Sequence, residues 1–242
     1  MKLSAIYVPK GRAREYSAYG LNLYNGCSFM CEYCSVPLTM KKDRLDFEKV
    51  EERKNLLVKI ENDCKKLEGL TERVLLCFSS DPYNDLDLDV ELTRKTLELF
   101  KKYNINFQML TKGGSRAERD FDLYKEGDAF ASTLTFVDDE KSLEWESKAP
   151  LASDRIETLK KAHSLGIETW VSLEPVVDVE ESLEIIRQTH SFVDLYKVGI
   201  LNYHELTDKI DWKDFGKRAI ALLESLGKNY YIKDDLKAYL EK

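Results

Sequence analysis

The sequence predicts an α/β fold in which a parallel sheet is covered by helices. Two observations lead to this prediction. Short continuous apolar runs, which are typical of strands buried on both faces, alternate six times with longer amphipathic stretches. In addition, no internal repeat, low-complexity tract or linker-like change of composition divides the 242 residues. We therefore expect one domain built on one sheet.

Six segments are expected to form the strands, in chain order. They are Gly20–Tyr24, Arg73–Ser79, Asn106–Leu110, Ala129–Phe136, Ile167–Leu173 and Val193–Val198. A further short strand near residues 230–232 and a last helix finish the chain. An N-terminal arm, up to about Tyr19, is expected to wrap over the body.

Amphipathic periodicity predicts six helices between and after these strands. They cover Asp43–Leu67, Asp89–Tyr103, Arg116–Lys125, Ser153–Leu165, Glu180–His190 and Asp211–Leu226. Ser153 is expected to be an N-cap, while Gly69, Gly166 and Gly227 follow helices as C-terminal glycines do.

The residues at the ends of the expected strands are unusually polar or glycine-rich. Parallel barrels place their active sites at the carboxyl ends of the strands, in the loops that follow. The groups to watch are Ser79-Ser80-Asp81, Thr111-Lys112-Gly113, Ser132 with Thr133 and Thr135, Glu174-Pro175, and Gly199.

Composition limits the class of protein. Apolar residues make up 43% of the chain, enough for a sizeable core, yet no run approaches the ~18 apolar residues of a membrane span. Five cysteines, an odd and clustered set, argue against a disulfide framework and for a reducing cytoplasm. The net charge of −7 counts against a constitutive nucleic-acid binder, although Lys10, Arg12 and Arg14 offer a local basic patch.

Three of the cysteines, Cys27, Cys31 and Cys34, have the spacing C-x3-C-x2-C. Thiolates select iron–sulfur clusters or zinc. Structural zinc usually has four protein ligands, commonly in two pairs. Here no second C-x2-C follows, and the three histidines lie more than a hundred residues away. The spacing favours a cluster with one open metal position; a zinc loop with a distant fourth ligand is the alternative.

This spacing, with aromatic Tyr33 just before the third cysteine, resembles the radical S-adenosylmethionine (SAM) superfamily. The flanks Gly11-Arg12-Ala13-x-Glu15-Tyr16 and Leu21-Asn22-Leu23-Tyr24-x-Gly26-Cys27 resemble its DNA-repair-photolyase-like branch, which includes spore photoproduct lyase. Met30 and Ser35 stand where these relatives usually have Gly and Tyr, which leaves the substrate open. The resemblance implies an open (β/α)6 partial TIM barrel. The single radical SAM domain then has an N-terminal arm (1–19), a core (20–200) and a C-terminal helical extension (201–242).

The resemblance also implies the chemistry. Cys27, Cys31 and Cys34 would each bind one iron of a [4Fe–4S] cluster, and the fourth iron would hold the amino and carboxylate groups of SAM. Reductive cleavage of SAM would yield a 5′-deoxyadenosyl radical that abstracts hydrogen from a substrate, with a photoproduct-lyase-like reaction as one candidate. An external one-electron donor, such as a flavodoxin- or ferredoxin-like protein, is implied. The alternative is a non-catalytic iron–sulfur or zinc protein that carries electrons or assists assembly.

Three side chains near the cysteines are expected to contact the cofactor. Tyr33 would lie against adenine, or pack the cysteine loop against the sheet. Ser80 and Asp81 follow the second strand, where relatives bind the SAM amino group. Strand parity turns only one of them toward the ligand, and a turn opened by Asp81 is the alternative.

Three more residues, in or after later strands, are expected to contact the cofactor. Lys112 would hold the SAM carboxylate as a point charge, or lie in solvent. Ser132, with Thr133, would bond the ribose or the methionyl carboxylate, or be satisfied within the barrel. Glu174 would meet the cofactor and need a buried partner, or else cap the next helix or lie in solvent.

The remaining predictions concern two cysteines and one charged pair. Cys77 is the catalytic candidate, because photoproduct-lyase-like enzymes use a cysteine to return hydrogen; a buried structural thiol is the alternative. Cys64, on a predicted helix, is a weaker candidate. Arg119 and Asp120 match a step in the same relatives and are expected to form a structural ion pair.

Overall fold

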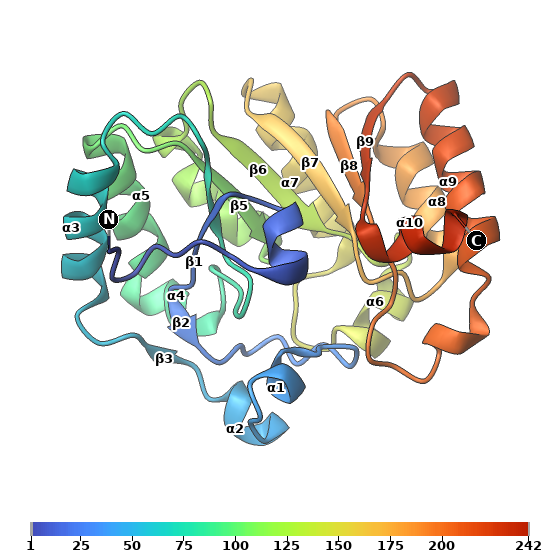
Figure 1. Ribbon diagram of the computed structural model, residues 1–242, viewed down its shortest axis with the longest axis horizontal. Helices are drawn as coiled ribbons and strands as arrows, with labels where there is room; N and C mark the ends of the chain where they lie inside the picture. Colours follow the sequence, from blue (N-terminus) through green and yellow to red (C-terminus); the bar gives the residue numbers. More distant parts are fainter. Residues whose placement is uncertain (1, 242) are drawn as a thin grey trace.

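The computed structural model describes residues 2–241. Its centre is one sheet of seven parallel strands in the order β1-β4-β5-β6-β7-β8-β9, so that each strand pairs with the next along the sheet (Figure 1). The strands are β1 Tyr19–Leu21, β4 Val74–Leu76, β5 Phe107–Thr111, β6 Ala129–Thr133, β7 Glu168–Leu173, β8 Leu195–Val198 and β9 Asn229–Ile232. The predicted α/β fold with a parallel sheet is confirmed.

A short antiparallel pair, β2 Tyr24–Asn25 with β3 Glu51–Glu52, stands apart from the main sheet. The helices are η1 Gly11–Glu15, α1 Val36–Thr39, α2 Arg44–Glu48, α3 Leu56–Leu67, α4 Asp85–Val90, α5 Leu92–Lys102, η2 Gly114–Leu123, α6 Asp139–Trp145, α7 Ala152–Ser164, α8 Val179–Thr189, η3 Thr207–Lys209, α9 Trp212–Ser225 and α10 Asp234–Leu240. Figure 1 shows α3 and α5 beside one end of the sheet and α8 and α9 beside the other. Between residues 2 and 241, no helix has both the length and the apolar character of a membrane span.

Alternation along β6 shows how the sheet separates two apolar regions. Phe130 joins the large core between sheet and helices, whereas Ala129 and Ala131 join a smaller cluster with Trp170 of β7. Successive side chains of a strand point to opposite faces, so small alanines on the inner face leave room for the indole. Tyr16 of the N-terminal arm packs against this inner cluster.

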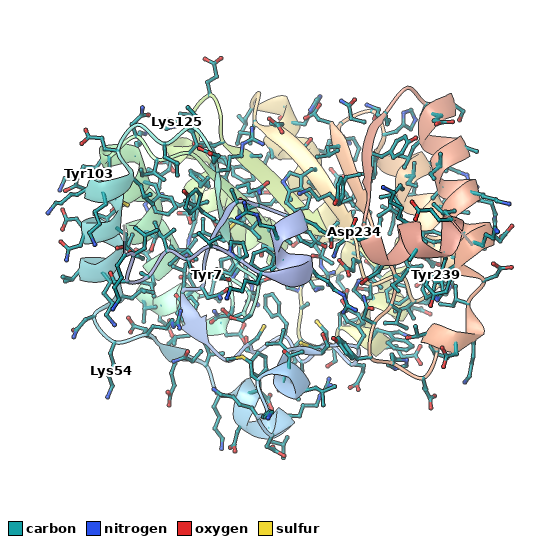
Figure 2. The ribbon with its side chains drawn as sticks, in the orientation of Figure 1. Tyr7, Lys54, Tyr103, Lys125, Asp234 and Tyr239 are labelled. Atoms are coloured by element: carbon teal, nitrogen blue, oxygen red, sulfur yellow. The ribbon has the colours of Figure 1, made fainter. Side chains whose placement is uncertain are left out.

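The arm fills the space between the first and last strands. Tyr7 pairs with Gly20 of β1 in an antiparallel bridge, and the Glu15 carboxylate accepts the backbone N–H of Asp234, which follows β9. Figure 2 shows Tyr7 and Asp234 on either side of η1. The Asp63 carboxylate of α3 accepts the backbone N–H groups of residues 4–6 and anchors the start of the arm. The arm therefore wraps over the body as predicted.

The segment predicted as one helix over Asp43–Leu67 is instead three elements, α2, β3 and α3. Lys49 is extended and Asn55 is left-handed, with φ of 56°. Because β3 pairs with β2, the chain must leave its helical path there. Residue periodicity carries no sign of this pairing, since its partner lies about thirty residues earlier.

Other predicted boundaries also need correction. The helix over 89–103 is split by Glu91, which has φ of 51°, and the helix over 116–125 is a 3-10 helix. Leu151, not Ser153, is the N-cap of α7, because the Ser153 hydroxyl donates to Asp139 of α6, a helix that was not predicted. The short strand predicted near residues 230–232 is confirmed as β9, which joins the sheet beside β8, so the extension over 201–242 is not only helical.

Gly26 lets the chain pass between β2 and the cysteines. Its φ is +86°, and a Cβ there would lie 2.5 Å from the carbonyl oxygen of Phe47 and 2.6 Å from that of Lys49. Gly69 has nearly the same φ, +84°, but a Cβ there would meet no atom within 4 Å. The two glycines therefore separate the cost of a left-handed backbone from the cost of a steric clash.

We predict that Gly26→Ala destabilises the protein more than Gly69→Ala. A left-handed alanine costs about 1 kcal/mol at either position, and the overlap at Gly26 adds about 1–3 kcal/mol. Urea unfolding of the two variants and the wild type measures the difference. Equal losses of unfolding free energy would contradict the close approach between Gly26 and the 47–49 segment.

Candidate functional site

A cavity of about 770 Å³ lies at the carboxyl ends of the strands. Its wall combines the cysteine loop, the ends of β4, β5 and β7, the arm, and the loop after β8. Residues singled out in the sequence line it, among them Cys27, Cys31, Tyr33, Cys34, Cys77, Ser80, Asp81, Lys112 and Glu174. Segments more than two hundred residues apart in the chain thus share one site.

The cysteine loop is held on two sides by backbone contacts. The N–H of Cys27 donates to the carbonyl of Phe47 at 2.9 Å, and the N–H of Glu32 donates to the carbonyl of Trp145 at 2.8 Å. The guanidinium of Arg44 donates to three consecutive loop carbonyls, of Met30, Cys31 and Glu32. The loop is therefore anchored without using its sulfur atoms.

The thiols of Cys27 and Cys31 are poorly ionised. Burial, helped by the charge of Asp81, raises the pKa of Cys27 to about 12. Burial also raises the pKa of Cys31, to about 11, although the ammonium of Lys112 works in the opposite direction. A metal that binds these sulfurs must displace their protons.

The donor set fits an iron–sulfur cluster. Three thiols line one cavity wall, and such a cluster uses cysteine thiolates as its protein ligands. The cavity also offers a buried Ser80 hydroxyl with no hydrogen-bond partner.

Ser80 and Asp81 differ in whether their side chains already make hydrogen bonds within the protein. The Asp81 carboxylate accepts from the Thr111 hydroxyl at 2.6 Å, from the Lys112 backbone N–H at 2.7 Å and from the Tyr83 backbone N–H at 2.9 Å. Burial raises the pKa of Asp81, and these hydrogen bonds oppose the rise. Asp81 thus ties the end of β4 to the end of β5, while the Ser80 hydroxyl stays uncommitted.

Of the two predicted cofactor contacts Lys112 and Ser132, only Lys112 faces the cavity. The Lys112 ammonium lies 5.4 Å from the centre of the Tyr33 ring and faces the cavity. Burial disfavours its charge, but Cys31 and Glu146 outweigh that effect and raise the pKa of Lys112. Ser132 does not reach the cavity: its hydroxyl donates to the carbonyl of Thr111, the alternative considered for it, and Thr133 lines the wall instead.

Tyr33 rests on a buried ion pair that the sequence analysis missed. Its hydroxyl donates to the Glu146 carboxylate, which in turn pairs with Arg155 at 2.6 Å. Both charged side chains are fully buried. Burial favours the neutral acid, but Arg155 and Lys112 outweigh burial and lower the pKa of Glu146. Tyr33 therefore packs the cysteine loop through its hydroxyl while its ring borders the cavity.

Glu174 has the buried partners that a carboxylate at this position needs. It accepts hydrogen bonds from the Tyr16 hydroxyl at 2.6 Å, from Asn202 at 3.3 Å and from the fully buried Lys233 ammonium. Neither Tyr16 nor Lys233 was predicted at the site, because they lie 158 and 59 residues away in the chain. Glu174 therefore fastens the arm to the barrel.

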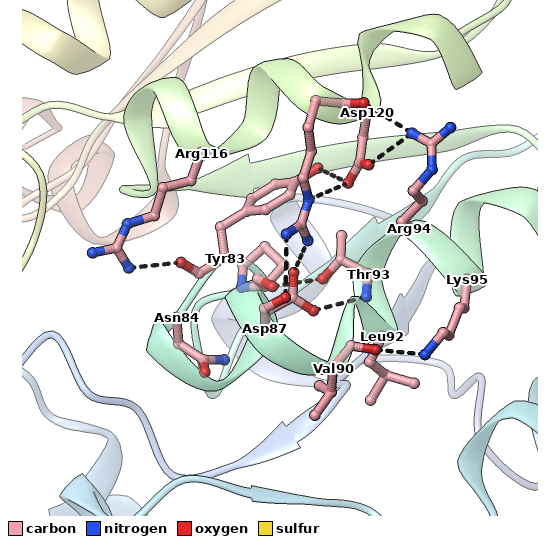
Figure 3. A network of polar contacts seen from close by, with 12 residues as sticks. Tyr83, Asn84, Asp87, Val90, Leu92, Thr93, Arg94, Lys95, Arg116 and Asp120 are labelled. Carbon is pink, nitrogen blue, oxygen red and sulfur yellow. Dashed lines mark hydrogen bonds and ion pairs between the residues drawn. The ribbon is translucent and has the colours of Figure 1, made fainter.

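Cys77, Cys64 and the pair Arg119–Asp120 complete the predicted set. Cys77 is buried beside the cavity, and burial raises the pKa of its thiol. Cys64 is packed in the main core. Figure 3 shows Asp120 among Arg94, Tyr83 and the guanidinium that also reaches Asp87. Arg119 lies 3.6 Å from Asp120, within a network that joins α4, α5 and η2, in line with a structural ion pair.

Lys197 is a buried cation beneath this site, and no carboxylate of residues 2–241 lies in hydrogen-bonding range of its ammonium. Its ammonium donates to the carbonyls of Glu15 and Tyr16, at 3.3 and 3.0 Å, and lies 4.8 Å from the Trp170 ring centre. Burial, helped by the nearby charge of Lys233, lowers the pKa of Lys197 to about 8. Lys197 thus binds two carbonyls of the arm, although burial disfavours its charged form.

Comparisons with known proteins agree with this architecture. The radical SAM superfamily matches the chain over residues 21–193. An uncharacterized protein of Methanocaldococcus jannaschii is 29% identical over 191 residues, which cover 76% of this chain and 70% of that protein. A mutant spore photoproduct lyase with bound AdoMet and a dinucleoside spore photoproduct has a TM-score of 0.70 at 11% identity, covering 93% of this chain and 78% of that one. SuiB of Streptococcus suis bound to S-adenosylmethionine has a TM-score of 0.66 at 14% identity, covering 92% and 52%.

We predict that Lys197→Met changes how stability depends on pH. Between pH ~8 and the ordinary lysine value near 10.5, the unfolded chain holds a proton that folded Lys197 has lost, so this residue makes stability rise with pH. The unfolding free energy of the wild type minus that of the variant should therefore increase by about 1.4 kcal/mol per pH unit in that window. Urea unfolding from pH 7 to 10 measures it.

Lys217→Met, on the exposed side of α9, is the matched control. Both variants keep the titrating thiols, so subtracting the control curve isolates the buried lysine. A constant difference across the window would contradict the assignment of Lys197 as a destabilised cation.

Proposed function

The chain belongs to the radical SAM superfamily, and we propose that its cavity holds a [4Fe–4S] cluster and SAM and acts as a radical enzyme. The observation that carries the proposal is that three cysteines and the uncommitted Ser80 and Lys112 side chains share one cavity wall. When bound, the cluster and SAM together supply one-electron cleavage of SAM and hydrogen abstraction from a substrate. The protein supplies ligation, orientation and protection from water.

In this proposal Cys27, Cys31 and Cys34 ligate the cluster. Lys112, a charged donor facing the cavity beside Cys31, holds the carboxylate of SAM. Ser80 accepts a hydrogen bond from the amino group, because its hydroxyl is buried and unpaired. Asp81 keeps the ends of β4 and β5 together, since three hydrogen bonds already occupy its carboxylate.

The arm protects the reaction from water in this proposal. Tyr16 inserts its ring against Phe78 and Trp170, with ring centres 5.6 and 5.9 Å apart, and its hydroxyl bonds Glu174. A closed and mostly apolar floor limits the escape of reactive intermediates. An external one-electron donor belongs to the same proposal, because SAM cleavage consumes one electron. A reducing compartment also belongs to it, because all five cysteines are free.

The substrate is proposed only as a class of candidates. A photoproduct-lyase-like reaction is the first to test, because spore photoproduct lyase shares the fold over most of the chain and Cys77 lines the cavity. The net charge of −7 counts against duplex DNA, and a nucleoside, a small metabolite or a peptide is an equal candidate. The alternative is an electron carrier, in which Ser80 and Lys112 have no ligand to bind.

The first prediction is that the reconstituted protein releases 5′-deoxyadenosine. Anaerobic reconstitution with ferrous iron and sulfide, reduction with dithionite and addition of SAM should yield the product in the wild type. Cys31→Ala should lose both cluster and product, whereas Cys64→Ala, in the core, should keep both. A stable four-iron cluster that neither binds nor cleaves SAM would support the electron carrier instead, and zinc without a cluster would defeat both.

The second prediction compares Ser80, which follows β4, with Ser132 of β6. Ser80→Ala should raise the KM for SAM about tenfold, because one charge-assisted hydrogen bond is lost, with a smaller effect on kcat. Ser132→Ala should leave the KM within about twofold, because its hydroxyl already serves a backbone carbonyl. Steady-state release of 5′-deoxyadenosine measures both. Equal effects at the two positions would remove Ser80 from the binding site.

A further inference from the structure

The pair Glu146–Arg155 is a fully buried ion pair close to the cysteine loop. A buried ion pair is a weak source of stability, since desolvation of both ions offsets their attraction. Glu146 follows α6 and Arg155 lies in α7. The pair reaches the cavity lining at two points: Glu146 accepts from the Tyr33 hydroxyl, and Arg155 donates to the carbonyl of Thr133. Because Tyr33 lies between Cys31 and Cys34 in the sequence, the first of these contacts suggests a role toward the cysteines.

We infer that Glu146 and Arg155 are positioning residues that fix the cysteine loop through Tyr33 and balance the charge around its cluster. The inference rests on the proposed function, because it presupposes that the cysteines ligate a cluster. It goes further in naming which protein charges set the reduction potential. Reduction potentials of iron–sulfur clusters depend on burial, nearby charge and hydrogen bonds.

The geometry fixes the pair tightly. One Glu146 oxygen accepts from the Tyr33 hydroxyl and from Thr135 at 3.3 Å; the other accepts from Arg155 at 2.6 Å and from Ser142 at 3.2 Å. The Nε of Arg155 donates to the carbonyl of Pro150 at 2.8 Å. With every lone-pair direction of the carboxylate in use, Tyr33 can hardly rotate away.

Charge counting gives the direction of the effect. Two cations, Lys112 and Arg155, and two carboxylates, Asp81 and Glu146, act on Cys27 and Cys31 from buried or partly buried positions. The half-buried guanidinium of Arg44 adds a third cation on the loop carbonyls. Reduction adds one negative charge to a cluster. Removing the Glu146 charge alone leaves an arginine that cannot lose its proton, which favours the reduced state.

The test is the midpoint potential of the reconstituted cluster in Glu146→Gln, followed by EPR during a redox titration without SAM. At a fixed solution potential, the ratio of reduced to oxidised cluster should rise about tenfold, which is ~59 mV for a one-electron couple. The double variant Glu146→Gln/Arg155→Met should return toward the wild-type potential, because it removes both charges.

Asp128→Asn is the matched control. Asp128 is also a buried carboxylate, accepting the backbone N–H groups of Phe107 and Lys125, but it lies at the amino ends of β5 and β6, away from the cavity. Figure 2 shows Lys125 at the far side of the molecule from α1 and α2. Asp128→Asn should lower the melting temperature of the protein and leave the midpoint potential of the cluster unchanged.

The outcomes are distinguishable. A wild type that assembles no four-iron cluster defeats the proposed function itself. A wild-type cluster whose potential does not change in Glu146→Gln, or changes equally in Asp128→Asn, overturns the inference alone. If Glu146→Gln assembles no cluster, Arg155→Gln serves instead: a potential at or below that of the wild type is expected, and a higher one overturns the inference.

Discussion

The open barrel leaves a gap between its two edge strands, and the rest of the structure depends on how that gap is filled. Edge strands expose unpaired backbone groups, and an open interior admits water. Here residues 4–16 cross from β1 to β9, with Tyr7 paired to Gly20 at one edge and Glu15 bonded after β9 at the other. Tyr16 then enters the interior, where Glu174, Lys197 and Trp170 surround it. Closure by a separate segment lets the sheet stay curved and incomplete.

The same closure explains which polar groups are free. Burying a charge is expensive unless it is paired, so the carboxylates of the interior are taken by protein donors. Asp81 holds two strand ends, Glu174 holds the arm, and Glu146 holds Tyr33. Among the lining residues, Ser80 keeps a buried hydroxyl with no hydrogen-bond partner, and Lys112 keeps its ammonium beside the Tyr33 ring. A site organised in this way presents few groups, but it presents them on a rigid frame.

Sequence patterns predicted the parts that depend on neighbouring residues and missed those that depend on distant ones. The apolar runs located all six strands, and polar strand ends pointed to the cavity, because both signals are local. The single left-handed residues Asn55 and Glu91 broke two predicted helices where pairing or a buried aspartate required it. No sequence pattern singled out Glu146 or Lys233, since their partners Arg155 and Glu174 are recognised only after folding. Parity suggested that only one of Ser80 and Asp81 would face a ligand, and the hydrogen bonds of Asp81 give that choice a physical basis.

The entrance to the cavity follows from the way its two sides are anchored. On one side, the arm is tied to the β9 end by the ion pair of Arg12 with Asp235 at 2.6 Å, and Arg12 also stacks over exposed Tyr203. On the other side, α1 and α2 are tied to the cysteine loop by Arg44. Each side has its own anchor, and both sides border the same cavity. A substrate that enters between them meets the arm on one side and the cysteine loop on the other. Changes to the arm can therefore alter what enters without disturbing the loop that holds the cysteines.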